Sequence, residues 1–149
     1  MGCDLKISQD SIVVSATDNL KPVRIQTQGY PGFPTDLQQP ITTLLTKCKG
    51  LSVVDETIYE NRFNNVKFLN KMGSSIIIGG RKIYISGPSK LYGKTVEATD
   101  LRAGACMILA ALSAEGITTI TSIEHVLRGY ENIIEKLQSV GAKIELEDI

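Results

Sequence analysis

The 149-residue sequence contains no tryptophan, a single histidine and three widely separated cysteines. His125 alone cannot build a histidine-rich metal site, and no nucleophile elbow lies near it to complete a Ser-His-Asp triad. Cys3, Cys48 and Cys106 form no Cys-x-x-Cys pair, and an odd, dispersed set favours reduced thiols in a cytosolic compartment over a disulfide framework. We therefore expect no metal and no other cofactor.

Net charge and long apolar runs are also absent. The 16 basic side chains balance 16 acidic ones, so no broad electrostatic surface for nucleic acid or an anionic membrane is indicated. No stretch approaches the roughly 20 consecutive apolar residues of a membrane span, and the N-terminus lacks the regions of a signal peptide. The sequence predicts a soluble, cytoplasmic protein without a nucleic-acid or membrane partner.

What the sequence does contain is an internal repeat. Thr35-Asp36-Leu37 recurs as Thr99-Asp100-Leu101, and an internal repeat identifies one supersecondary unit that is used again. Each copy continues with a glycine, an arginine and a second glycine at similar spacings: Gly50, Arg62 and Gly73 in one copy, and Gly116, Arg128 and Gly141 in the other. Both copies thus keep an acid at the start and an arginine in the middle.

A partial copy precedes these two. Gly2 is as far from Ile12 as Gly73 is from Ile83, and the run Ile12-Val13-Val14 matches Ile83-Tyr84-Ile85. No Thr-Asp-Leu or middle arginine precedes Gly2, so we interpret the chain as starting partway through a unit, as a fragment or a natural truncation. The expected division is the tail of one unit at 1–27, a second unit at about 33–98 and a third at about 99–149.

Hydrophobic periodicity predicts helix, strand, helix and strand in each unit. In the last unit we expect a helix over 101–114 that is apolar nearly all round and therefore buried, a strand over 118–121, a loop with Glu124, His125 and Arg128, a helix over 130–140 and a strand over 143–147. In the middle unit we expect helices over 37–49 and 63–72 and strands over 51–57, 76–78, 82–86 and 94–98. The predicted fold is α/β, with buried helices and outer mixed sheets.

Two acids and three arginines are candidates for chemistry. Asp36 and Asp100 are placed at helix N-termini, where a capping role is favoured over that of a general base or acceptor of a substrate hydroxyl. Arg102 lies in a first helical turn, either as a clamp for phosphate or carboxylate or in a salt bridge with Asp100 or another acid. The equivalent Arg62 and Arg128 either link to their unit's acid or converge with Arg102 on a small polyanion.

Four segments in register resemble the C-terminal part of the UDP-N-acetylglucosamine 1-carboxyvinyltransferases, enolpyruvyl transferases of peptidoglycan synthesis. They are Phe33-Pro34-Thr35-Asp36, Glu60-Asn61-Arg62-Phe63, Ala98-Thr99-Asp100-Leu101-Arg102-Ala103 and Arg128-Gly129-Tyr130-Glu131. The resemblance implies a domain of repeated βαβ-containing units with helices inside and sheets outside, here incomplete and without its N-terminal partner domain. It also implies a bacterial cytoplasmic enzyme of cell wall biogenesis, and thus of cell shape, division and the cell cycle.

The implied reaction transfers enolpyruvate from phosphoenolpyruvate to the 3′-hydroxyl of UDP-N-acetylglucosamine and releases phosphate. By position, Asp36 resembles the acid beside that hydroxyl, and the backbone of Ile58 matches a contact with the nucleotide sugar. Arg102 and Arg128 resemble the arginines that hold phosphoenolpyruvate, while Arg62 and Asp100 match further active-site positions.

The family's catalytic cysteine lies on the other domain, and Cys3, Cys48 and Cys106 do not match it. We therefore expect this chain alone to be inactive, and to self-associate through apolar surface left uncovered. Two alternatives remain open: part of the sister transferase that acts on shikimate 3-phosphate, and a non-catalytic binding module built from the same repeats.

Overall fold

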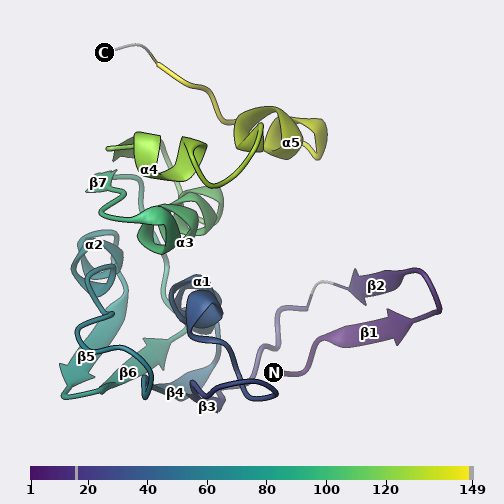
Figure 1. Cartoon of the computed structure of the whole chain (residues 1–149), viewed down its shortest axis with the longest axis vertical. Coiled ribbons are helices and arrows are strands. Elements are labelled where there is room, and N and C mark those ends of the chain that lie inside the picture. Colours follow the sequence, from purple (N-terminus) through teal and green to yellow (C-terminus); the bar gives the residue numbers. More distant parts are fainter. Residues whose placement is uncertain (16, 148–149) are drawn as a thin grey trace.

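The computed structural model describes residues 1–15 and 17–147 (Figure 1). The chain begins with an antiparallel hairpin of β1 (Asp4–Ile7) and β2 (Ile12–Ser15), all of whose residues are exposed. In Figure 1 this hairpin extends away from the rest of the molecule. No helix of the described residues is long and apolar enough to cross a membrane.

A four-stranded mixed sheet forms the lower part of the molecule in Figure 1. Its strands are β3 (Arg24–Gln26), β4 (Gly50–Asp55), β5 (Ser75–Gly79) and β6 (Lys82–Gly87), in the order β3-β4-β6-β5. β3 runs parallel to β4, whereas β4–β6 and β5–β6 are antiparallel. Side chains alternate between the faces, so Val54, Ile76, Ile83 and Ile85 are buried on the face that meets the helices.

The helices pack on the inner side of this sheet, as expected. α1 (Gln38–Leu45) follows the short 3-10 helix η1 (Thr35–Leu37), α2 (Val66–Lys71) comes next, and α3 (Leu101–Leu112) packs against α1. α3 buries Ala103, Gly104, Cys106, Met107, Ile108 and Ala110, which confirms the prediction of a buried helix. α1 buries polar side chains instead, and its Thr43 hydroxyl contacts Cys106 Sγ at 3.0 Å.

The last part of the chain is a smaller layer on the other side of α3. β7 (Thr95–Glu97) pairs in parallel with β8 (Thr119–Thr121), and α4 (Glu124–Leu127) and α5 (Ile133–Ser139) follow. A second apolar cluster of Ala98, Ile108 and Val126 joins these elements to α3.

The structure corrects several boundaries. The helix expected over 37–49 ends at Leu45, where 3-10 turns take over, and the helix expected from 63 begins at Val66 after a turn segment. The residues around Glu124 and His125 form the short helix α4 rather than a loop. The strand expected over 143–147 is absent from the described residues. In the middle unit, the strand that corresponds to 143–147 is β5, which pairs only with β6. The described part of the last unit has no strand equivalent to β6, so 143–147 has no partner strand there.

Gly93 lies where the chain of the middle unit meets the last one. Its N–H donates to the carbonyl of Glu115 at 2.7 Å, and a Cβ added there would lie 2.5 Å from the carbonyl carbon of Ile117. Both contacts are with backbone atoms, of Glu115 and Ile117, so a side-chain rotation cannot relieve the clash.

We predict that Gly93→Ala lowers the free energy of unfolding, measured by urea denaturation, by about 1–3 kcal/mol, as overpacking does. Gly29→Ala is the control, because nothing lies within 4 Å of its added Cβ; equal losses in both variants would contradict the prediction.

Asp100 caps α3, as the sequence suggests. Its Oδ1 accepts hydrogen bonds from the backbone N–H of Arg102 at 2.8 Å and of Ala103 at 3.0 Å, and its Oδ2 accepts one from Asn64 at 3.0 Å. Burial acts to raise the pKa of Asp100, but the bonds from Asn64, Ala103 and Arg102, with the charge of Arg102, hold it below its usual value.

We predict that Asp100→Ala destabilises the chain by about 1 kcal/mol at neutral pH, and that Asp100→Asn, which keeps one acceptor, costs less. Because the folded pKa lies below the unfolded one, the carboxylate's contribution is present above about pH 4 and is lost as the pH falls through the folded value. Urea unfolding across the acid range should show this loss in the wild type and a shallower pH dependence in Asp100→Asn. The same acid slope in both proteins would show that another group is responsible.

Candidate functional site

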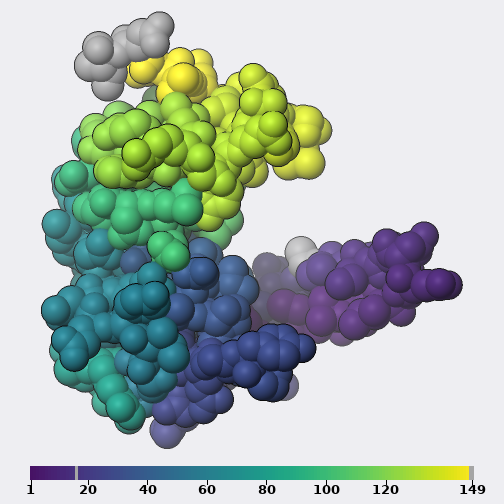
Figure 2. All heavy atoms as spheres, in the orientation of Figure 1, coloured from purple at the N-terminus to yellow at the C-terminus, as the bar shows by residue number. Residues whose placement is uncertain are grey.

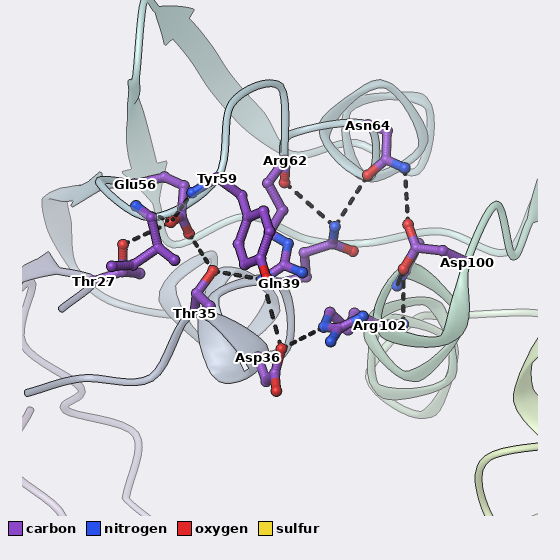
Figure 3. Close-up of polar contacts among 12 residues, drawn as sticks. Thr27, Thr35, Asp36, Gln39, Glu56, Tyr59, Arg62, Asn64, Asp100 and Arg102 are labelled. Atoms are coloured by element: carbon purple, nitrogen blue, oxygen red, sulfur yellow. Dashed lines mark hydrogen bonds and ion pairs between the residues drawn. The ribbon is translucent and has the colours of Figure 1, made fainter. Parts of the chain in front are cut away.

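Two arginines from distant segments approach the carboxylate of Asp36 (Figure 3). Asp36 lies in η1, Arg62 in the turn segment before α2, and Arg102 in the first turn of α3. Arg102 Nε donates to Asp36 Oδ1 at 2.6 Å, and Arg62 Nη1 lies 3.6 Å from the same oxygen. Asp36 remains 64% exposed, against 33% for Arg102 and 13% for Arg62, so solvent reaches the acid more easily than its partners.

The capping interpretation is therefore wrong for Asp36, although it holds for Asp100. η1 and α1 have no side-chain cap, and the Asp36 carboxylate bonds to Arg102 instead. Of the two interpretations of Arg102, the structure shows the ion pair, with Asp36 rather than Asp100 as the partner.

The electrostatics of this cluster keep Asp36 ionised. The hydrogen bond from Arg102 lowers the pKa of Asp36, slight desolvation opposes this, and the charges of Arg102 and Arg62 add to the lowering. Asp36 in turn raises the pKa of Arg102. While Arg102 is bound to it, Asp36 is a good hydrogen-bond acceptor and a weak base.

Glu56 organises the loops behind the cluster, and the sequence analysis missed it. Its carboxylate is almost fully buried and accepts hydrogen bonds from the hydroxyls of Thr27 at 2.8 Å and Thr35 at 2.9 Å. It also accepts hydrogen bonds from the backbone N–H groups of Ile58 at 2.9 Å and Tyr59 at 3.1 Å. The strand expected over 51–57 included Glu56, whereas β4 ends at Asp55 and leaves Glu56 directly after the strand. Through Thr35, which also accepts from Arg62 at 2.6 Å, Glu56 is connected to the arginine cluster.

A chain of amide side chains joins Asp100 to the backbone carbonyl of Arg62, to which Gln39 Nε2 donates at 3.3 Å. Gln39 Nε2 donates to Asn64 Oδ1 at 3.0 Å, and Asn64 Nδ2 donates to Asp100 Oδ2 at 3.0 Å and to the hydroxyl of Thr99 at 2.8 Å. Figure 3 shows these residues between η1 and the N-terminus of α3. Arg102 bonds to both acids, through its side chain to Asp36 and through its backbone N–H to Asp100, and Gln39 and Asn64 connect Asp100 to Arg62.

The remaining candidates lie around this network. Ile58 is 46% exposed with its N–H held by Glu56, and the guanidinium of Arg62 stacks over the Tyr59 ring at 4.2 Å. Arg128 is exposed just after α4 and, within the described residues, has no hydrogen bond or ion pair with the network. Its neighbour Gly129 packs closely on Leu101, which brings this loop beside the first turn of α3. The structure therefore joins Asp36, Arg62, Asp100 and Arg102, whereas Arg128 stays apart.

The two buried cysteines, Cys48 and Cys106, offer no activated thiol. Burial raises the pKa of Cys106 to about 11, against hydrogen bonds from Thr43 and Asn65, and burial also raises the pKa of Cys48. All three cysteines are free. No cluster of His, Cys, Asp and Glu in the described residues could hold a metal ion.

Comparisons with known proteins agree with the resemblance noted in the sequence. The model of the EPSP synthase (3-phosphoshikimate 1-carboxyvinyltransferase) family matches residues 1–137. UDP-N-acetylglucosamine 1-carboxyvinyltransferase 2 of Listeria monocytogenes is 52% identical over 144 residues, which cover 97% of this chain and 34% of the relative. The UDP-N-acetylglucosamine 1-carboxyvinyltransferase of Clostridium botulinum is 53% identical with the same coverage. The chain thus spans about a third of the length of the curated relatives it matches.

Solved structures give the same result for the fold. The enolpyruvyl transferase NikO from Streptomyces tendae superposes with a TM-score of 0.90 at 30% identity, over 97% of this chain and 34% of that one. An EPSP synthase from Acinetobacter baumannii, at 20% identity over 99% of this chain and 35% of its own, has a TM-score of 0.65 and shares the fold. The expected fold class is confirmed, and the chain belongs to the EPSP synthase family of carboxyvinyl (enolpyruvyl) transferases.

Proposed function

We propose that this chain is the substrate-binding C-terminal part of an enzyme that transfers enolpyruvate from phosphoenolpyruvate to the 3′-hydroxyl of UDP-N-acetylglucosamine. The observation that carries the proposal is the 52% identity, over 97% of the chain, to a relative named for this reaction. The relatives are about three times as long, so we propose that another domain of the same protein supplies the main catalytic cysteine. The chain alone is then inactive.

The arginine cluster suits phosphoenolpyruvate, which carries a phosphate and a carboxylate. Guanidinium groups bind both anions through paired N–H donors, and Arg62 and Arg102 already face the same oxygen of Asp36. We propose that Arg102 exchanges Asp36 for the incoming anion, and that Arg128 approaches the same ligand from the loop beside α3. Cations in these positions would stabilise the charge that develops as the tetrahedral centre forms and phosphate leaves.

The same exchange would prepare Asp36 as the base. The acceptor hydroxyl adds its oxygen to C2 of phosphoenolpyruvate and loses its proton, while the methylene carbon C3 gains a proton and becomes a methyl group. Loss of phosphate from C2 and of a proton from C3 then re-forms the double bond and gives the enol ether. A carboxylate that has lost its arginine partner is a stronger proton acceptor, because the bond from Arg102 is the largest influence lowering its pKa. Asp36 would accept the hydroxyl proton once Arg102 has moved to the anion.

We propose positioning roles for the other candidates. Asp100 uses its oxygens to cap α3 and to bind Asn64, so it orients the turn that carries Arg102. Glu56 holds the backbone of Ile58, the proposed contact for the nucleotide sugar. A bacterial cytoplasmic location and a role in cell wall biogenesis, cell shape and division are part of the same proposal, as is self-association of the isolated chain.

Transfer to shikimate 3-phosphate is the second candidate function, because the matched family is named for that reaction. Identity favours the nucleotide sugar: it is 52% to the Listeria relative but 20% to the EPSP synthases. Assays of the full-length protein with phosphoenolpyruvate and each acceptor separate the two. If phosphoenolpyruvate released phosphate with shikimate 3-phosphate as acceptor but not with UDP-N-acetylglucosamine, the proposed acceptor would be wrong. Phosphate release by the isolated chain would overturn the need for a second domain.

In the full-length protein we predict that Asp36→Asn lowers kcat by about 10²–10⁴, the range for loss of a general base. We predict that Arg128→Ala raises the KM for phosphoenolpyruvate. The matched controls are Asp10→Asn on the distant hairpin and Arg81→Ala, whose partner Asp55 lies on the four-stranded sheet, and both should retain activity. Phosphate release in steady state measures all four. Full activity in Asp36→Asn and Arg128→Ala would support a non-catalytic module instead.

The exchange model also makes a prediction for the Asp36 carboxyl group itself. Arg102→Ala removes the hydrogen bond that is the main cause of its low pKa, so we expect the pKa of Asp36 to rise. Carboxyl ¹³C chemical shifts followed by NMR through the acid range measure it. Arg81→Ala should leave this pKa unchanged, and phosphoenolpyruvate added to the wild-type protein should raise it. An unchanged pKa in Arg102→Ala would refute the proposed coupling.

A further inference from the structure

Glu56 is a buried carboxylate that is held by neutral donors. It is 3% exposed, and the ion pairs of residues 1–15 and 17–147 include none to it. Its Oε1 accepts hydrogen bonds from Thr27, Ile58 and Tyr59, and its Oε2 accepts one from the Thr35 hydroxyl. Burying a carboxylate is costly unless hydrogen bonds compensate for the lost water. The four donors offset that cost, and each of them is thereby fixed in one orientation.

The bond to Glu56 sets the direction of the Thr35 hydroxyl. A hydroxyl has one proton to donate and lone pairs that accept, whereas a guanidinium group only donates. The Thr35 proton is committed to Glu56 Oε2 at 2.9 Å, so a lone pair remains for Arg62 Nη1, which lies at 2.6 Å. Figure 3 shows both bonds meeting at this hydroxyl. The carboxylate of Glu56 therefore makes Thr35 an acceptor for Arg62.

The two arginines at Asp36 are held to different degrees. The guanidinium of Arg62 lies 4.2 Å from the centre of the Tyr59 ring, and its side chain is 13% exposed. The backbone carbonyl of Arg62 also accepts a hydrogen bond from Gln39 Nε2 at 3.3 Å. The side chain of Arg102 is 33% exposed, and among the described residues its one side-chain hydrogen bond is that to Asp36. Arg62 is therefore the fixed partner of Asp36, and Arg102 is the exchangeable one.

We propose that Glu56 is a positioning residue for the acceptor step: through the Thr35 hydroxyl it holds Arg62 beside Asp36 while Arg102 moves to the incoming anion. Arg62 Nη1 lies 3.6 Å from Asp36 Oδ1, so its charge restrains the carboxylate without the short hydrogen bond that Arg102 makes. Asp36 then keeps its place while its oxygen is open to the acceptor hydroxyl. This inference rests on the proposed function, because it takes Asp36 as the group that accepts the proton.

The two oxygens of Glu56 have separate tasks, and this allows a sharp substitution. Three donors meet Oε1, so in Glu56→Gln the amide oxygen takes that place and keeps the bonds from Thr27, Ile58 and Tyr59. The new amide N–H then faces the Thr35 hydroxyl and donates where a carboxylate oxygen accepted. The hydroxyl proton has to turn away from residue 56, toward the donors of the arginine. The loop after β4 stays held, whereas the bond that fixes the arginine is lost.

The first test is steady-state phosphate release by the full-length protein with phosphoenolpyruvate and UDP-N-acetylglucosamine. We expect Glu56→Gln and Thr35→Val each to lower kcat by about 10- to 100-fold, as a displaced catalytic group does, and to leave the KM for phosphoenolpyruvate unchanged. Thr35→Ser keeps the hydroxyl and should retain the wild-type kcat. The double variant should be no slower than Thr35→Val, because both changes act through one hydroxyl. Losses that multiply in the double variant would overturn the inference.

Three controls separate this effect from the loss of a charge, of a buried acid or of a hydroxyl. Asp10→Asn removes a charge from the hairpin, which stands clear of the rest of the molecule in Figure 2. Asp55→Asn changes the neighbouring acid, whose side chain is 13% exposed and pairs with Arg81. Thr46→Val removes a buried hydroxyl that donates to the carbonyl of Thr43 at 2.7 Å. Circular dichroism checks that all variants fold alike. Losses in these controls equal to those of the site variants would also overturn the inference.

The second test needs no turnover. NMR of the guanidinium groups in arginine-labelled full-length protein measures rotation about the Nε–Cζ bond, and Arg62→Lys identifies the Arg62 signal. Rotation should be slow for Arg62 in the wild type and faster in Glu56→Gln and Thr35→Val, with Arg81 unchanged. Equal rotation of Arg62 in all three proteins would overturn the inference even in an active enzyme. A wild type that releases no phosphate would refute the proposed function, whereas faster rotation of Arg62 in the variants would still show that Glu56 holds it.

Discussion

The burial of α3 is the constraint on which the site depends. This helix is apolar on nearly every side and lies between the layer of the four-stranded sheet and the layer of β7, β8 and α4. Packing on both sides determines where its N-terminus emerges, and the carboxylate of Asp100 closes that end with two backbone hydrogen bonds. Arg102, in the first turn of this helix, donates to Asp36 of the preceding unit at 2.6 Å. The hydrophobic effect has no directional preference of its own. By burying α3, it nevertheless helps to bring the charged Arg102 within hydrogen-bonding distance of Asp36.

The polar groups around this point are shared between neighbouring units. Asp36 and Arg62 come from the middle unit, and Asp100 and Arg102 begin the last one. Asn64 and Gln39 connect them through side-chain amides, and Glu56 holds the loop that follows β4. A site assembled at a junction in this way requires two adjacent repeats. It also leaves its most exposed carboxylate, that of Asp36, paired with two arginines.

Backbone hydrogen bonding explains where the repeats differ. β6 completes the sheet beside β4 and buries Ile83 and Ile85, while the hairpin β1–β2, with the same register, leaves the equivalent side chains uncovered. Residues 143–147 have the alternating pattern of a strand but have no adjacent strand of the β6 type among the described residues. A strand pattern is realised only where the N–H and C=O groups of a neighbour are available to pair with it.

The sequence by itself determined the repeat, the buried character of α3, the capping of that helix by Asp100 and the family. Each of these follows from local spacing or from residue type, so no distant contact is needed to infer them. The tertiary structure decided the partner of Arg102, the buried position of Glu56 and the separation of Arg128 from the other arginines. It also decided that Asp36 pairs with arginine rather than capping a helix, and that 143–147 is not a strand. These features depend on which residues far apart in the sequence come within a few ångströms of each other, and spacing along the chain does not contain that information.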